Sequence, residues 1–122
     1  NVEPPGYARV SRIGCSHPWV NYCDSVHAAI RFVLSEGKRV IVVGQPRMSG
    51  TVTAAHAKQQ HMLGAMIRSE FASEPHVAYV DLGNAVDLGD PDYTFDAMHL
   101  NGEGNRKVAE VLAPHVLAMA KQ

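Results

Sequence analysis

The sequence lacks several features that would assign it to a large functional class. Its formal net charge is only −1, so it carries no general electrostatic attraction to nucleic acid or to an anionic membrane. No apolar run approaches the length of a membrane-spanning helix, and the first residues do not combine a basic region with an apolar one as a signal peptide does. We therefore expect no nucleic-acid partner and no membrane span.

Cysteine is scarce as well. The two cysteines, Cys15 and Cys23, form no CxxC pair and match no zinc-finger spacing. They fit a local disulfide in an exported protein, and they fit equally well two free thiols in a reducing compartment. A disulfide would favour a secreted or periplasmic location, and the sequence leaves the compartment open.

Metal and cofactor motifs are also lacking. His56 and His61 are five positions apart, so they do not share a helix face as an i,i+4 pair would. The scattered aspartates do not follow the spacing of a calcium loop, and no glycine-rich phosphate-binding pattern is present. We expect neither a metal nor a cofactor.

The sequence does contain alternating helix and strand patterns. Apolar residues at spacings of three and four predict a helix over residues 24–36 that stops at Gly37. "VIVVG" at residues 40–44 and "HVAYVDL" at residues 76–82 predict strands, the first of them buried on both faces. Residues 54–72 between these strands predict a long helix.

A last helix is predicted toward the end of the chain. Pro114 lies inside it and should kink or split it. The helix should bury an apolar stripe that consists of Val108, Val111, Leu112, Val116 and Met119.

This order of elements predicts an α/β architecture. Strands joined by a long helix are parallel with a right-handed crossover, which places helices on both faces of the sheet. The chain has 122 residues, enough for one domain, but two parallel strands make a poor sheet because both are edges. We expect strands that precede Asn1 to complete the sheet, so that residues 1–122 form the C-terminal part of a single domain.

Asp96 and His99 stand three positions apart in the loop before the last helix. A carboxylate bonded to one imidazole nitrogen fixes the tautomer of the ring and lets the other nitrogen act as a general base. The loop follows a strand, at the carboxyl edge where open α/β sheets bind ligands. The pattern D-x-x-H is common, however, and a solvated histidine beside a capping aspartate is the simpler explanation of it.

The wider segment "DAMHLNGEGNRKVAEVLAP" resembles the last conserved block of the SGNH hydrolases, the GDSL family of esterases and lipases. "GKRVIVVGQPRM" and "HVAYVDLGNAV" resemble the penultimate and last strands of that family, so that the resemblance covers about residues 22–120. It implies a three-layer α/β/α, flavodoxin-like parallel sheet, of which this chain supplies the last two strands and their flanking helices. It also implies that Asp96 and His99 belong to a Ser-His-Asp triad.

The chain departs from the family pattern at the nucleophile. It contains no G-D-S block, and none of its serines follows a strand in that pattern. The resemblance implies an oxyanion-donating Asn at a strand end upstream of residues 40–44. Asn1 has that placement, although Val2 stands where the family has Asp, and an Asn1 without any role is an equally good interpretation. We expect the nucleophilic serine to come from a preceding segment or from a second chain.

The prediction is therefore a serine esterase or lipase of the SGNH type that acts on a short acyl or acetyl ester, including esters of carbohydrates. His99 would take the proton of the serine, Asp96 would orient His99, and Asn1 would help to hold the oxyanion. This chain alone would be incomplete and inactive. The alternative is a non-catalytic α/β binding or assembly module that keeps the last block for packing.

Overall fold

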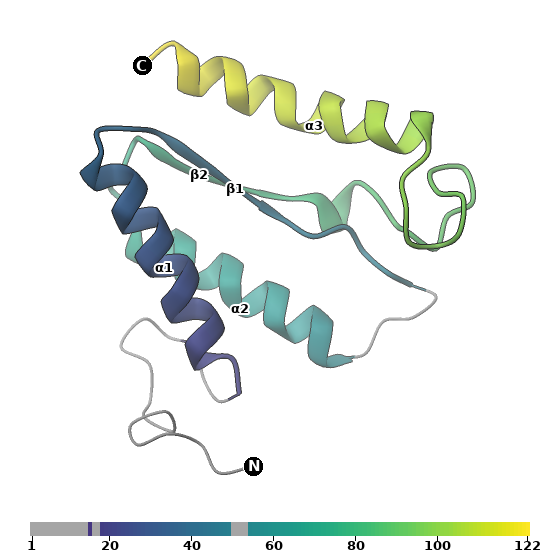
Figure 1. Ribbon diagram of the computed structural model, residues 1–122, viewed down its shortest axis with the longest axis horizontal. Coiled ribbons are helices and arrows are strands. Elements are labelled where there is room, and N and C mark those ends of the chain that lie inside the picture. The colour runs from purple at the N-terminus through teal and green to yellow at the C-terminus, as the bar shows by residue number, and fades with distance from the viewer. Residues whose placement is uncertain (1–14, 16–17, 50–53) are drawn as a thin grey trace.

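The computed structural model describes residues 15, 18–49 and 54–122 of the chain. Within them, helices and strands alternate in the expected order (Figure 1). The elements are α1 (Val20–Ser35), β1 (Val40–Gly44), α2 (Ala54–Glu70), β2 (Val77–Asp81), a short 3-10 helix η1 (Leu82–Asn84) and α3 (Gly102–Ala120).

The two strands form a parallel pair, with Val40 opposite Val77 and Gly44 opposite Asp81. They make up the whole sheet among the described residues. α1 and α2 lie beneath this sheet and α3 lies above it (Figure 1). α1 contacts β1, whereas α2 and α3 contact β2. The predicted α/β class and the parallel pairing are confirmed.

α1 begins at Val20, so the expectation that this helix starts at Asp24 is wrong. Helices commonly begin at a polar N-cap, but here Trp19 occupies the N-cap and makes no side-chain capping bond. Burial holds the first turn instead, because the side chains of Val20 and Cys23 are 5% and 0% exposed.

The end of α1 follows the sequence prediction. Gly37 has a φ of +71°, in the left-handed region that glycine adopts without a steric penalty. Its N–H donates to the carbonyl of Leu34 at 3.0 Å, and the N–H of Lys38 donates to the carbonyl of Val33 at 3.2 Å. These two bonds form a Schellman motif, which satisfies carbonyls at the end of the helix.

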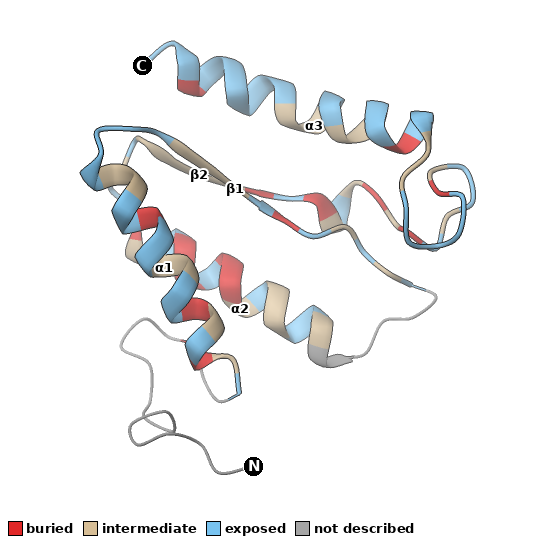
Figure 2. Cartoon of the chain, in the orientation of Figure 1, coloured by how far each residue is buried: buried red, intermediate tan, exposed pale blue. Residues whose placement is uncertain are grey.

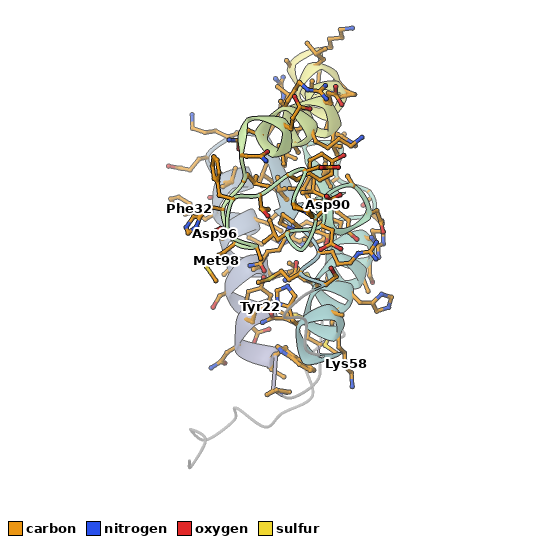
Figure 3. The ribbon with its side chains drawn as sticks, turned by 90° about the vertical axis from the view of Figure 1, so that its right-hand side faces the viewer. Tyr22, Phe32, Lys58, Asp90, Asp96 and Met98 are labelled. Carbon is orange, nitrogen blue, oxygen red and sulfur yellow. A yellow bond between two sulfur atoms is a disulfide. The ribbon has the colours of Figure 1, made fainter. Side chains whose placement is uncertain are left out.

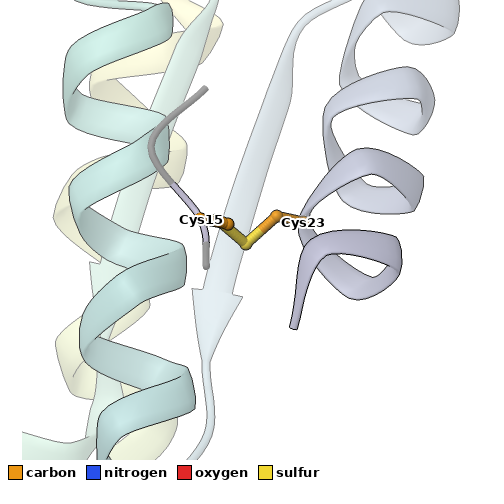
Figure 4. Close-up of a disulfide and its surroundings, with 2 residues drawn as sticks. All are labelled: Cys15 and Cys23. Atoms are coloured by element: carbon orange, nitrogen blue, oxygen red, sulfur yellow. A yellow bond between two sulfur atoms is a disulfide. The ribbon is translucent and has the colours of Figure 1, made fainter. Parts of the chain in front are cut away.

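A disulfide joins Cys15 and Cys23, the bonded alternative of the two that the sequence left open (Figure 4). Both residues are at most 1% exposed. They belong to the core cluster between α1 and α2, which also contains Ile30, Leu63, Met66, Ile67 and Phe71. The disulfide therefore links Cys15 covalently to α1 within the core between α1 and α2.

Burial is concentrated between the sheet and the α1–α2 layer, while α3 is mostly exposed (Figure 2). On β2, Val80 is 4% exposed. On β1, Val43 is 40% exposed, so the described residues do not bury "VIVVG" on both faces as its composition predicted. The physical reason is that Val43 lies on the face opposite the α1–α2 core, where α3 contacts β2 more than β1.

The structure corrects two points about α3. Of the kink or split expected at Pro114, the split does not occur, because the helix runs through this residue. Pro114 and Glu110 are both exposed, so the Glu110 carbonyl that loses its helical donor remains open to water. Val116 was expected in the buried stripe but is 52% exposed, because the narrow sheet covers only part of the helix, whereas Met119 is 8% exposed. No helix in the described part of the chain has both the length and the apolarity needed to cross a membrane.

Candidate functional site

Backbone hydrogen bonds close the base of the loop that carries Asp96 and His99. The N–H of Asn101 donates to the carbonyl of Tyr93 at 2.8 Å, and the N–H of Phe95 donates to the carbonyl of His99 at 3.1 Å. Ladder-like bonds of this kind hold the two arms of a loop together. The loop therefore presents residues 96–98 at its tip.

The start of α3 is tied to the same loop. Asn101 is the N-cap of α3, and its Oδ1 accepts the N–H of Gly104 at 2.8 Å. Its Nδ2 donates to the carbonyl of Asp92 at 3.0 Å. Gly104 is packed so closely that a Cβ there would collide with the carbonyl oxygen of Tyr93. Asn101 and Gly104 of the family-like block thus have structural roles that fix the loop relative to α3.

Asp96 and His99 are in direct contact at the tip. Oδ2 of Asp96 lies 2.6 Å from Nδ1 of His99. Oδ1 of Asp96 accepts the backbone N–H of His99 at 2.7 Å and that of Met98 at 3.0 Å. Ala97 between them has a φ of +63°, a left-handed conformation that is uncommon for a residue other than glycine. The carboxylate is therefore oriented by three hydrogen bonds within four residues of sequence.

These hydrogen bonds lower the pKa of the Asp96 carboxyl from 3.8 to about 2. The side-chain bond from His99 is the largest cause, and the backbone bond from His99 is the next. Asp96 is consequently ionised at neutral pH. Its Oδ2 then accepts a hydrogen bond from Nδ1–H of the His99 ring. That tautomer leaves Nε2 of His99 with its lone pair, which is the arrangement a general base needs.

Asp96 and His99, which we call the dyad, are open to solvent. The side chains of His99 and Asp96 are 72% and 51% exposed, and Nε2 of His99 makes no hydrogen bond to any described residue. Met98 is 61% exposed beside them. Figure 3 shows Asp96 and Met98 on the same side of the molecule as Phe32 of α1, which is 66% exposed. The dyad thus faces the same side of the molecule as α1, although Figure 1 places its loop and the end of α1 at opposite ends of the sheet.

No serine of the described residues contacts His99. Ser35 donates to the carbonyl of Phe32, and the N–H of Ser49 donates to Asp87. The candidate oxyanion donor Asn1 lies outside the described residues. The described part of the chain therefore supplies an acid–base pair without a nucleophile beside it.

A cavity of about 410 Å³ opens at the carboxyl edge of the sheet. It is lined by residues 45–49 after β1, by one side of α2 and by residues 81–84 around the end of β2. Arg47 and Met48 lie in the loop that follows β1, and the cavity that they help to line was not predicted from the sequence. Asp96 and His99 do not line it.

Backbone bonds couple the two loops that form this cavity. The N–H of Arg47 donates to the carbonyl of Val86 at 2.9 Å, and the N–H of Leu88 donates to the carbonyl of Arg47. Oδ1 of Asp87 accepts the N–H of Ser49 at 3.0 Å, and this bond is the main reason that the pKa of Asp87 lies below its usual value. The loops after β1 and β2 accordingly continue the parallel pairing of the two strands, with Arg47 opposite Asp87.

Metal binding finds no support in residues 15, 18–49 and 54–122, where no group of three or more histidine, cysteine or acidic side chains comes together. Known proteins offer no further guide, since no family model, no curated protein and no solved structure matches this chain.

Proposed function

We propose that this chain supplies the acid–base pair of a serine hydrolase of the SGNH type, which cleaves a short acyl or acetyl ester. The observation that carries the proposal is the 2.6 Å contact between Oδ2 of Asp96 and Nδ1 of His99. The resemblance of the segment from Asp96 to Pro114 to the last block of that family supports it. The substrate would include esters of carbohydrates, and the reaction requires neither metal nor cofactor.

In the proposed reaction, a serine hydroxyl attacks the carbonyl carbon of the ester while Nε2 of His99 takes its proton. The ionised Asp96 stabilises the imidazolium that forms. Hydrogen-bond donors hold the oxyanion of the tetrahedral intermediate, with Asn1 as our candidate for one of them. His99 then protonates the leaving alcohol, and water hydrolyses the acyl-serine by the same route.

The serine would come from a preceding segment or from a second chain that docks on the open edge of β1. The N–H of Val40 donates to the carbonyl of His76, the residue before β2, so the alternation of a parallel ladder turns the N–H and C=O groups of Ile41 and Val43 away from β2. Such an edge, with Val43 exposed on the same strand, is suited to another strand. We propose that added strands complete a three-layer, flavodoxin-like sheet of one domain.

A non-catalytic binding or assembly module is the second candidate. It is favoured by the exposed apolar side chains next to the dyad, Phe95 at 80% and Met98 at 61%. Large exposed apolar side chains that lie together are typical of protein interaction surfaces. In that case Asp96 would serve only to hold the loop, through the N–H groups of Met98 and His99.

The test is hydrolysis of p-nitrophenyl acetate by the full-length protein. We expect His99→Ala to lower kcat/KM by at least about a thousandfold, because removal of a triad base leaves only binding and oxyanion stabilisation. His115→Ala is the matched control, since His115 is an exposed histidine of α3 outside this loop. Wild-type activity in His99→Ala would eliminate the hydrolase proposal and leave the binding module.

A further inference from the structure

The cavity at the carboxyl edge contains hydrogen-bond donors that are not fully satisfied by the described residues. Nε2 of Gln60 is buried without a partner among the described residues, although its Oε1 accepts the N–H of Gln45 at 3.1 Å. The guanidinium of Arg47 makes one long bond, from Nε to the carbonyl of Gly83 at 3.5 Å. A buried donor without a partner, as Nε2 of Gln60 is, costs free energy, and Arg47 is exposed beside it, so an oxygen-bearing ligand would be stabilised here.

The charges around Arg47 narrow the choice of ligand. Asp81 lines the same cavity, and Asp87 faces Arg47 across the two loops. Asp87 attracts Arg47 electrostatically, but neither Asp87 nor Asp81 forms an ion pair or hydrogen bond with its guanidinium among the described residues. The fork of Arg47 therefore remains available for a bidentate acceptor. The same two carboxylates repel a dianion more strongly than a monoanion.

The remainder of the lining is suited to an apolar tail. Pro46, Met48 and Ala57 contribute to the wall of the cavity, whose volume is about 410 Å³. Volumes of this order accommodate small ligands with a few polar anchors.

We propose that this cavity binds a small aliphatic monocarboxylate. Its carboxylate accepts hydrogen bonds from Arg47 and Gln60, and its tail contacts Pro46, Met48 and Ala57. This site lies apart from Asp96 and His99, and its occupation does not depend on the proposed hydrolysis.

The first measurement is the titration of the full-length protein with sodium butyrate, followed by NMR of the Gln60 side-chain amide and the Arg47 Nε–H. We expect saturable binding that shifts both signals. Butyramide, which has the same shape without the charge, should bind at least about tenfold more weakly, because charge-assisted bonds are about twice as strong as neutral ones. Inorganic phosphate should also bind more weakly. Absence of butyrate binding, or equal or tighter binding of butyramide or phosphate, would overturn the proposal.

Variants test the two ends of the ligand separately. Arg47→Gln should weaken butyrate binding about tenfold or more, and Arg106→Gln, an exposed arginine of α3, should not change it. The backbone bonds of Arg47 to Val86 and Leu88 remain in the variant, so its fold should persist. Ala57→Leu, on the exposed side of α2, should weaken butyrate more than acetate. If both anions lost affinity equally in Ala57→Leu, or if Arg47→Gln bound butyrate normally, the assignment of the two ends would be wrong.

Discussion

Replacement of Asn101 by alanine tests whether the loop of the dyad is held by its connection to α3. Asn101 contributes two side-chain hydrogen bonds, to the N–H of Gly104 at 2.8 Å and to the carbonyl of Asp92 at 3.0 Å. Loss of an N-cap costs about 1 kcal/mol, and loss of a further hydrogen bond costs about 0.5–1 kcal/mol. We therefore expect Asn101→Ala to lower the free energy of unfolding by about 1.5–2 kcal/mol.

The assay is urea denaturation of the full-length protein, with ester hydrolysis as a second readout. Asn101→Asp keeps the acceptor for Gly104 and removes the donor to Asp92, so it should retain the capping part of the stability. Asn105→Ala is the control, because Asn105 is exposed on the same helix and its side chain makes no hydrogen bond within the described residues. If Asn101→Ala cost no more stability than Asn105→Ala, the loop would not depend on its cap.

Three further predictions concern the core, the dyad and the open sheet edge. Replacement of both Cys15 and Cys23 by alanine should lower the free energy of unfolding by about 2–3 kcal/mol, because the unfolded chain gains the entropy that closure of the short loop removes. Denaturation of the wild type and of the double variant measures this difference. The carboxyl of Asp96 should titrate near pH 2 by NMR, and His99→Ala should return its pKa toward 3.8. The contribution of its ionisation to stability is then complete above about pH 3.8 and is lost as the pH falls through about 2, because the folded-state pKa is the lower one. Residues 1–122 by themselves should show no cooperative thermal transition, since Val43 at the β1 edge and Phe32 are exposed, and a sharp transition of the monomer would contradict this.

The sequence predicted most of what depends on local periodicity. The strands at residues 40–44 and 76–82, the helix between them and the end of α1 at Gly37 follow from apolar spacing and from the conformational freedom of glycine. These features depend on near neighbours in the chain, so a single sequence contains the information that specifies them.

Features that depend on tertiary contacts were not predictable in the same way. α1 begins at Val20 because the first turn of the helix is buried in the core around the disulfide. The sequence contains no capping residue there that would predict this start. Val116 belongs to a regular apolar stripe, yet its exposure depends on the width of the sheet beneath α3. The cavity beside Arg47 requires the loops after both strands to be joined, which no local pattern specifies.

The positions of the dyad, the cavity and the open edge bear together on the proposed function. The dyad and exposed Phe32 lie on the same side of the molecule, as Figure 3 shows. An added strand at β1 would extend the sheet on that side, and its carboxyl end would lie at the same edge of the sheet as the loop of His99. Under the proposed function, a serine at that strand end would be placed near Nε2 of His99, which does not line the Arg47 cavity. Under the proposed function, the exposed dyad and the unpaired strand edge share one explanation, a segment that carries the nucleophile and pairs in parallel with β1.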